Sequence, residues 1–387
     1  MKLLIYIIGV MLSALFLVSC GGDDGKSDPV AVENDQDDDT PSTEVNDDYT
    51  YTLPVVFHVL YKDATDSMQY VRASRIRELL QHVNELYRGG YYGESQDMNL
   101  RFELAEKDEN GNKLSTPGVH YVQWPGQYPI DPYTFMSDNT GANVKYIWDP
   151  NEYINVMLYN FDAEEGSDGM LLGISHMPYT VKGEHAIAGL DSIEQRTLSK
   201  RNLNYAYCSS INSLYVYSQS SRYDQSDRGK NGYYYVSTDV CVTLAHELGH
   251  YLGLHHMFCE RDGEMANDCA DTDYCDDTPS YNRVEYTQFM SDYFETHTGD
   301  DVKMSDLVRR NNCEGDQFLS ANLMDYAISY GYKFSADQKK RVRHVLYYSP
   351  LMPGPRKTES TSRTPAPSHP RTPTPDGPID LPIRIVK

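Results

Sequence analysis

One short stretch, residues 246–256, constrains the fold of this chain more than any other. It reads HELGHYLGLHH and lies at the end of an apolar run. His246 and His250 are four residues apart, so on a helix their side chains lie on one face, one turn apart. Gly253 can adopt a positive φ, which ends a helix and turns the chain sharply. The stretch therefore predicts a helix over 237–253, followed by a reversal that brings later residues back to the two imidazoles.

The polar residues of this stretch have the spacing of a metal centre. Two neutral imidazoles at i and i+4 can share one Zn²⁺ ion, and a third histidine after the turn would leave one coordination position open. The pattern H-E-x-x-H-x-x-G-x-x-H selects His256 as that third ligand. We interpret its neighbour His255 as a side chain on the rim that makes ordinary hydrogen bonds. Glu247 flanks the same helix face, where its carboxylate could reach a water molecule at the metal.

Hydrophobic patterns elsewhere predict a mixed α/β fold. Apolar residues recur at helical spacing over 73–90, and strand patterns cover five segments: 53–60, 98–105, 153–159, 170–177 and 213–217. Ser237 or Thr238 could begin the helix that carries the histidines, and Ser335 with Gln338 forms a capping box for a C-terminal helix. This order fits a twisted, mostly parallel sheet with two long helices packed on it. The segment 179–235 has weak periodicity, and we assign no other element within it.

The first twenty residues predict export. Lys2 precedes an apolar run that is too short to argue for a membrane-spanning helix. The run ends in LVSC, which resembles the lipobox of bacterial lipoproteins. That resemblance implies removal of residues 1–19 and a lipid anchor on Cys20. The alternative is an ordinary secretory signal with an incidental cysteine.

The two ends of the chain differ in composition from its middle. Residues 20–50 are acidic with little to bury, which predicts a solvated tether, and residues 353–387 are rich in Pro, Ser and Thr, which predicts a poorly packed tail. One domain is expected over 51–352. The net charge of −23 argues against a nucleic-acid partner. Lipoproteins on the outer surface of some Gram-negative bacteria have a similar acidic patch, which implies an outer-membrane lipoprotein exposed on the cell surface, with the periplasmic face as the alternative.

Six cysteines remain after Cys20: Cys208, Cys241, Cys259, Cys269, Cys275 and Cys313. An even number in an exported protein indicates up to three disulfides. A four-cysteine zinc site would need paired C-x₂-C knuckles, which these spacings lack. The acidic loop among them could hold Ca²⁺ through four carboxylates: Asp271, Asp273, Asp276 and Asp277. Its spacing is not that of an EF-hand, so a solvated acidic loop closed by disulfides is an equal alternative.

The long histidine motif and a downstream turn, NLMDYA at 322–327, together resemble the metzincin metallopeptidases. Within that group, GLHHMF at 253–258, DDTPS at 276–280 and N-x-M-D-Y are similar to the pappalysins. The resemblance covers roughly residues 53–348. It implies a metzincin-like single catalytic domain whose C-terminal subdomain holds the Met-turn and a terminal helix.

The resemblance also implies roles for individual residues. His246, His250 and His256 would be the zinc ligands. Glu247 would act as general base and then acid, Met324 would form an apolar floor under the metal, and Tyr326 would direct its hydroxyl at the developing oxyanion. The implied disulfides are Cys259 with Cys275 and Cys269 with Cys313, which leaves Cys208 and Cys241 as a third pair.

These expectations combine into a membrane-anchored zinc endopeptidase that acts on extracellular or periplasmic proteins. An extended peptide substrate would lie as an added strand along 170–177. Two alternatives remain open from the sequence. One is a surface lipoprotein that binds glycans or proteins, suggested by the signal, the tether and the many tyrosines. The other is a zinc amidase or deacylase that acts on non-peptide substrates.

Overall fold

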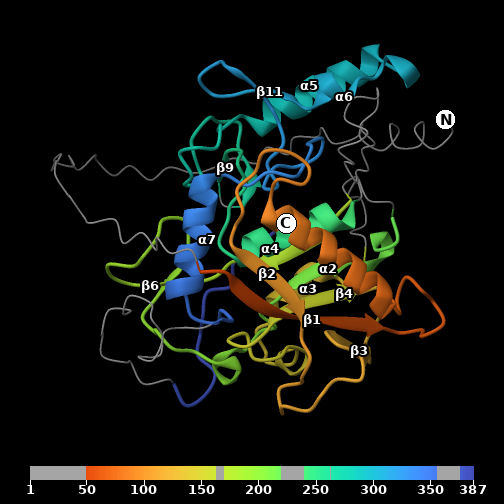
Figure 1. The fold of residues 1–387 in the computed structure, drawn as a ribbon, viewed down its shortest axis with the longest axis vertical. Helices are drawn as coiled ribbons and strands as arrows, with labels where there is room; N and C mark the ends of the chain where they lie inside the picture. The colour runs from red at the N-terminus through yellow and green to blue at the C-terminus, as the bar shows by residue number, and fades with distance from the viewer. Residues whose placement is uncertain (1–48, 163–169, 219–238, 262, 355–374) are drawn as a thin grey trace, which may run out of the picture.

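The computed structural model describes residues 49–162, 170–218, 239–261, 263–354 and 375–387 (Figure 1). The predicted signal peptide at 1–19, Cys20 and nearly all of the predicted tether lie outside the described residues. Among the residues described, no helix is both long and apolar enough to cross a membrane.

A seven-stranded sheet forms the centre of the fold. Its main path runs through six strands in this order: β13 (Ile385–Val386), β5 (Gly173–His176), β8 (Ser209–Asn212), β4 (Ile154–Tyr159), β1 (Tyr51–Tyr61) and β2 (Leu100–Leu104). The seventh strand, β3 (Val119–Gln123), pairs with the second half of β1. All pairs among β1, β2, β3, β4 and β8 are parallel, whereas β5 and β13 are antiparallel to their neighbours. The expected mostly parallel sheet is therefore confirmed.

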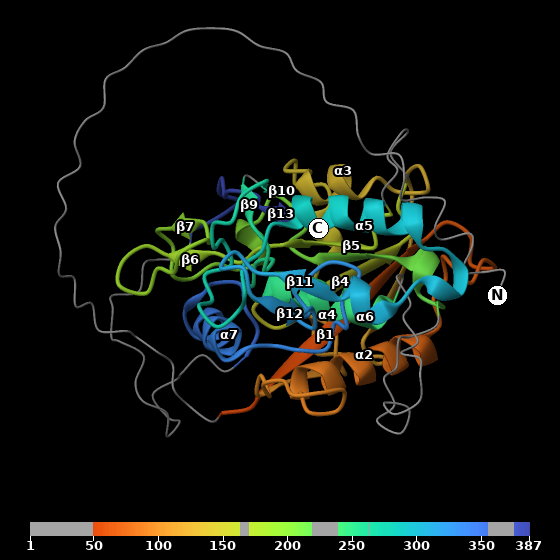
Figure 2. The ribbon, with the colours of Figure 1, turned by 90° about the horizontal axis from the view of Figure 1, so that it is seen from above.

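The central strand β1 explains why the sheet lies deep in the molecule. Its consecutive apolar residues, from Val55 to Phe57 and again at Val59 and Leu60, are all fully buried. A strand that is apolar on both faces requires cover on both sides, as parallel sheets usually have. Figure 2 shows that cover, with α2 (Ala73–Arg88) on one side of the sheet and α3 (Pro132–Ser137) on the other.

The helix with the histidine motif is α4 (Val240–Tyr251). It packs beside α2, and the Tyr87 hydroxyl of α2 donates to the carbonyl of Ala245 at 3.0 Å. Asp239 is its N-cap and accepts hydrogen bonds from the backbone N–H groups of Cys241 and Val242. The expected cap residues Ser237 and Thr238 lie outside the described residues. A buried polar contact and a side-chain cap thus fix the position of α4 on the sheet.

A second, smaller core forms after the turn at Gly253. It consists of buried apolar residues from the segments around α5 (Arg283–Thr296), α6 (Met304–Leu307) and the hairpin of β11 (Arg309–Asn311) and β12 (Gln317–Leu319): Met257, Phe258, Tyr281, Tyr286, Met290, Tyr293, Leu307, Val308 and Ile328. These elements lie at the top of Figure 1. The last helix, α7 (Ala336–Tyr348), packs instead on the main core. The expected C-terminal region with a terminal helix is present.

The strand predicted at 213–217 is wrong. Residues Ser213–Tyr215 form a 3-10 turn, and the strand β8 lies directly before it. The Asn212 side chain accepts a hydrogen bond from the Leu214 N–H and starts that turn. The sequence of β8, SSIN, is mostly polar although it is fully buried, so its hydrophobic pattern gave no signal.

The tail also differs from the expectation of a poorly packed segment over 353–387. Its residues 375–387 lie against the domain and supply the edge strand β13. Leu381 is only 5 % exposed, and the Asn202 side chain donates to the carbonyls of Pro375 and Gly377. The physical reason is an alternating pattern at Ile379, Leu381, Ile383 and Ile385, which suits an extended segment with one buried face. The prolines around this pattern concealed it.

The capping box of α7 offers a test of local stability. Ser335 accepts from the Gln338 N–H at 3.1 Å, and the Gln338 side chain accepts from the Ser335 N–H at 2.9 Å. Ser335→Ala removes the side-chain cap and should lower the free energy of unfolding by roughly 1 kcal/mol, measured by chemical denaturation. Ser335→Gly is the control and should cost only roughly a few tenths of a kcal/mol. Equal losses for both variants would contradict the role of the cap.

Candidate active site

Three histidine side chains meet at one point beside the second core. The Nε2 atom of His250 lies 3.0 Å from that of His246 and 3.0 Å from that of His256, and the remaining pair is 3.2 Å apart. All three residues are buried. Within the described part of the chain, they are the only group of three or more side chains placed to hold a metal ion together.

The other ring nitrogen of each histidine decides what the cluster can bind. The Nδ1 atoms of His246 and His250 donate to backbone carbonyls at 2.7 and 2.8 Å, which leaves each Nε2 with a bare lone pair. His256 Nδ1 lies 2.7 Å from the Glu260 carboxylate, and zinc-binding histidines commonly have such a carboxylate partner at their other nitrogen. Burial lowers the pKa of all three imidazoles, so they stay neutral. Three converging lone pairs repel one another unless a cation lies between them.

The spacing also fits zinc. Zn–N bonds of about 2.0–2.1 Å in a tetrahedron would place the nitrogen atoms roughly 3.3 Å apart. The observed separations are 3.0–3.2 Å. Three histidines fill three of the four positions, which leaves one open, as in catalytic rather than structural zinc sites.

The turn at Gly253 brings the third histidine back to the helix. Gly253 has φ of 93°, and its N–H donates to the carbonyl of His250. The next residue, Leu254, donates its N–H to Gly249 and accepts the Nδ1 hydrogen bond of His250. A Cβ on Gly253 would lie 2.7 Å from a Val345 methyl of α7. Glycine is therefore required both by backbone conformation and by space.

Met324, which the metzincin resemblance implied as a floor under the metal, packs against α4 at Gly249. It is fully buried, and a Cβ on Gly249 would lie 2.5 Å from its sulfur. Gly249 is therefore the place on α4 where the Met324 side chain fits between the first two histidines. The residue before it, Leu323, supplies the carbonyl that orients His246.

A buried charge network holds the turn that carries Met324. The Asp325 carboxylate accepts from the Tyr281 hydroxyl at 2.5 Å and from the Ser320 hydroxyl, and it lies 3.7 Å from both Arg283 and Arg310. The two guanidinium groups also donate to the backbone carbonyls of residues 327 and 328. The carboxylate and the carbonyls are thus compensated by two cations, which locks the shape of the turn.

Tyr326 is held against the histidines by the same turn. Its ring lies 4.5 Å from that of His256 and 5.9 Å from that of His246, measured between centroids, with the Arg283 guanidinium over it at 5.6 Å. Burial raises the pKa of its hydroxyl well above the usual value, so the group remains a proton donor in hydrogen bonds. That hydroxyl donates to the backbone oxygen of Lys387.

Glu247 lies on α4 between the first two ligands in sequence and is buried. One of its carboxylate oxygens has no hydrogen-bond partner among the described residues, and burial raises the pKa of the group well above its ordinary value. It packs against Gly173 of β5, where a Cβ would lie 2.5 Å from its Cγ. A positive ion at the histidines would favour the ionised carboxylate again. Gly173 thus provides the space in which Glu247 lies.

His255 differs from its expected place on the rim. It is buried, because the loop that carries Tyr274 covers it, and the two rings lie 5.3 Å apart between centroids. It is not part of the metal-binding group. The motif register therefore selects the correct neighbour, but the other histidine packs inside the domain.

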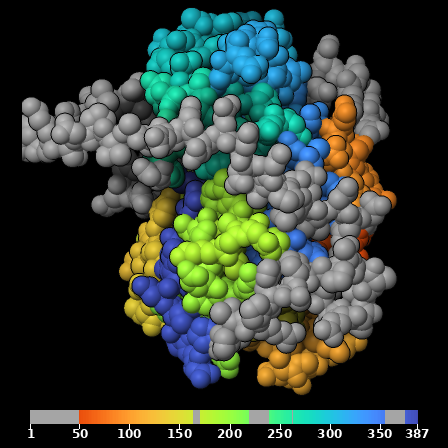
Figure 3. All heavy atoms as spheres, turned by 90° about the vertical axis from the view of Figure 1, so that its left-hand side faces the viewer, coloured from red at the N-terminus to blue at the C-terminus, as the bar shows by residue number. Residues whose placement is uncertain are grey.

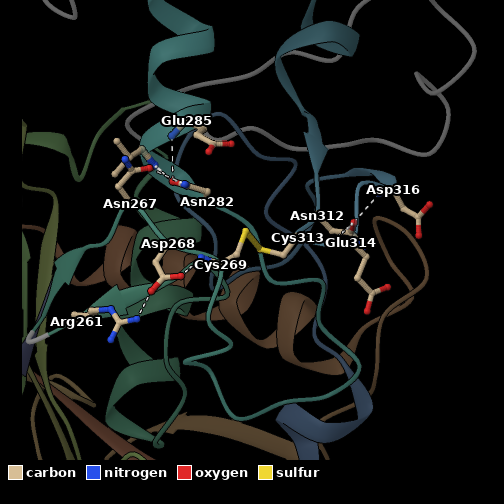
Figure 4. Close-up of a disulfide and its surroundings, with 11 residues drawn as sticks. Arg261, Asn267, Asp268, Cys269, Asn282, Glu285, Asn312, Cys313, Glu314 and Asp316 are labelled. Carbon is tan, nitrogen blue, oxygen red and sulfur yellow. Dashed lines mark hydrogen bonds and ion pairs between the residues drawn. A yellow bond between two sulfur atoms is a disulfide. The ribbon is translucent and has the colours of Figure 1, made fainter.

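One of the three expected disulfides is present. Cys269 and Cys313 are bonded, with their Cα atoms 5.5 Å apart, and link the acidic loop to the hairpin of the second core (Figure 4). The structure does not join Cys259 to Cys275 or Cys208 to Cys241. Cys208 instead places its sulfur 3.4 Å from that of Met136 in α3. The count of cysteines could not show this, because it carries no information on which sulfurs meet.

The carboxylates proposed for Ca²⁺ are not brought together as a metal site. No group of three ligands in the described residues includes Asp271, Asp273, Asp276 or Asp277. Asp273 is buried and accepts from the Cys275 N–H and the Thr278 hydroxyl, and burial raises its pKa to about 8. Asp271 caps the N–H groups of the next turn, and Asp277 accepts from the Asp337 N–H of α7. At least three of the four therefore stabilise the loop and its neighbours.

Three residues that matter to the site were missed from the sequence. They are Glu260, Gly173 and Arg283, which orient His256, make room for Glu247 and hold the turn. Glu260 lies four residues after His256, and this spacing next to a metal ligand was an available signal. The other two come from distant segments, and nothing in their local sequence marks them.

Comparisons with known proteins find one matching family model and similar solved structures. Residues 215–347 match the Peptidase_M43 family model, described as pregnancy-associated plasma protein-A. No match is found among curated proteins. Of the solved structures, mature mirolysin from Tannerella forsythia in complex with a cleaved peptide has a TM-score of 0.47 and 19% identity, over 77% of this chain and 92% of that one. Mirolysin in complex with compound 9 has a TM-score of 0.46 and 20% identity, over the same shares.

Two neighbouring histidines allow a direct test of the metal site. His256→Ala should lose most of the bound zinc, because it reduces three ligands to two. His255→Ala is the matched control and should keep the metal near one equivalent, since this side chain is not in the cluster. Metal content is measured by elemental analysis after dialysis. Zinc loss in His255→Ala with retention in His256→Ala would contradict the assignment.

Proposed function

We propose that the chain carries a pappalysin-like metzincin metallopeptidase domain and is an endopeptidase that cleaves exported proteins with Glu247 as general base. The observation that carries the proposal is the buried set of three imidazoles with one open position, next to a carboxylate that has an unsatisfied oxygen. Structural zinc sites fill all four coordination positions with protein ligands, so an unsatisfied carboxylate beside the metal would have no role in such a site.

Different side chains at the site carry out different parts of the proposed hydrolysis. When bound, zinc would polarise the scissile carbonyl and lower the pKa of water at the site. Glu247 takes the proton from the attacking water and delivers it to the leaving amine. Tyr326 donates a hydrogen bond to the oxygen on which negative charge develops. Gly173 and the surrounding core keep the Glu247 carboxylate away from bulk water.

The proposed substrates are extended segments of extracellular or periplasmic proteins. β5 is short and borders the site through Gly173, and a substrate strand would pair with its outer edge in place of β13. Strand addition recognises peptides through the main chain, with side-chain pockets adding selectivity. An amidase acting on small non-peptide substrates would have no need for that edge.

Replacement of Glu247 tests the function and the mechanism together. Glu247→Gln keeps the size and helix preference of the residue but cannot accept a proton at neutral pH. Cleavage of a peptide library should fall by about two to four orders of magnitude while zinc stays bound. The matched control is Glu264→Gln on the exposed strand β10 (Glu264–Met265), which should change neither quantity.

Three other outcomes would count against this proposal. Nearly full cleavage by the Glu247→Gln variant with full zinc would overturn the mechanism. No cleavage of any peptide by the zinc-loaded wild-type chain, with turnover of small amides, would favour the amidase. Absence of any hydrolysis, with glycan or protein binding unaffected by a chelator, would favour a binding lipoprotein.

We also propose that Cys20 anchors the protein to the outer membrane through lipid, with the domain displayed on the cell surface. The support is LVSC and the acidic residues behind it. Cys20→Ser should move the protein from the membrane fraction to the soluble fraction, with peptidase activity unchanged, as followed by fractionation and peptide cleavage. A Cys20→Ser variant that still sediments with membranes would contradict the anchor.

A further inference from the structure

We infer that residues 379–387 are a built-in ligand of the β5 edge at which substrates are proposed to bind, so that the chain competes with its own substrates. The inference rests on the proposed peptidase function for its consequence, but the contact itself stands on geometry alone. The edge of β5, which was expected to receive an extended peptide, is occupied by β13 of the same chain. Figure 3 shows this segment in dark blue on the surface, beside the yellow and yellow-green parts of the domain.

The segment pairs with β5 as a substrate strand would. It runs antiparallel, with Ile385 opposite His176 and Val386 opposite Ser175. The Met177 N–H donates to the carbonyl of Arg384 at 3.0 Å, so these two residues form a hydrogen-bonded pair. Hydrogen-bonded and non-bonded pairs alternate along antiparallel strands. The Val386 N–H therefore faces β5, whereas the Ile385 N–H faces away.

The segment also reaches the catalytic groups. The Tyr326 hydroxyl, which is proposed to stabilise the oxyanion, donates to the backbone oxygen of Lys387. The same backbone also lies close to the imidazole of His256. A backbone oxygen of the tail thus takes the hydrogen bond that the scissile carbonyl of a substrate would need.

Contacts farther from the metal hold the segment in place. Leu381 is buried in the main core, and Ile379 and Ile383 pack against the same core. The three residues alternate along the extended segment and therefore lie on one face of it. The Tyr179 hydroxyl donates to the carbonyl of Pro382 at 2.7 Å, and the Arg384 side chain donates to that of Gly189. Apolar burial and hydrogen bonds along the segment thus fix one register on the edge of β5.

Such a segment acts as an intramolecular competitor. A substrate can bind only to the fraction of molecules in which the tail has left, so its apparent KM is the intrinsic KM divided by that fraction. The kcat is unchanged, because the tail is absent from every molecule that has bound substrate. Competition therefore predicts an effect on KM alone.

Two substitutions of equal charge in the full chain test this. Leu381→Asp places a carboxylate in the core and should release the segment. Pro378→Asp is the control, because it adds the same charge at an exposed position of the same tail. If the tail occupies nine-tenths of the molecules, Leu381→Asp should lower KM about tenfold with kcat unchanged, and Pro378→Asp should do neither. An unchanged KM in Leu381→Asp would overturn the inference.

Hydrogen–deuterium exchange provides a readout that does not require activity. The Met177 amide is protected by Arg384 and should exchange faster in Leu381→Asp than in Pro378→Asp. This result would support occupation of the β5 edge by the tail even if no peptide were cleaved, in which case only the proposed function would fail. Equal protection in both variants would overturn the inference whatever the activity.

A synthetic peptide of residues 376–387 gives a third test that does not depend on the folding of a variant. It should restore inhibition when added to the Leu381→Asp protein. N-methylation at Val386 should weaken that inhibition, because the N–H faces β5, whereas N-methylation at Ile385 should have little effect. Equal inhibition by both methylated peptides would contradict the proposed register.

Discussion

The structure around the site depends on one electrostatic constraint, the meeting of three imidazole lone pairs at a single point. Each ring is committed through its other nitrogen to a hydrogen-bond partner, so none can turn away without breaking a buried hydrogen bond. The partners come from three places: the turn before Met324, the reversal after Gly253 and the carboxylate of Glu260. The chain from Gly253 to Met324 has to fold back against α4 for all three to be present. Metal affinity and the folding of this region are therefore coupled.

The Asp325 network shows how a small core can hold a precise turn. A buried carboxylate alone would be costly, but two arginines and two hydroxyls surround it. The arginines come from α5 and from β11, so the turn is tied to two separate elements. Arg310 also stacks on Tyr286, with its guanidinium 3.4 Å from the ring centroid. The side chains of Asp325, Arg283 and Arg310 thus fill part of the interior of the second core, which contains few aliphatic side chains.

Sequence reasoning succeeded where the chemistry is local. The helix, its terminating glycine, the three ligands and the capping box at Ser335 each depend on residues a few positions apart. It failed at β8, whose buried polar residues carry no hydrophobic pattern, and at the tail, whose alternation is interrupted by Pro382. It could not find Gly173 or Arg283, because their importance arises only when distant segments meet. The prediction of disulfide pairing fails for the same reason, since the spacing of cysteines in the sequence does not determine which sulfur atoms approach one another.

The position of β13 has a consequence for the behaviour of the protein in solution. Strand β5 would otherwise end the sheet with unpaired backbone groups, and such an edge can pair with the edge of another molecule. The short strand Ile385–Val386 covers this edge. β13 itself is only two residues long, follows Pro382 and is flanked by the charged residues Arg384 and Lys387. Each of these features discourages another strand from pairing with its outer edge. The same few residues thus protect the molecule against edge-to-edge association between neighbouring copies.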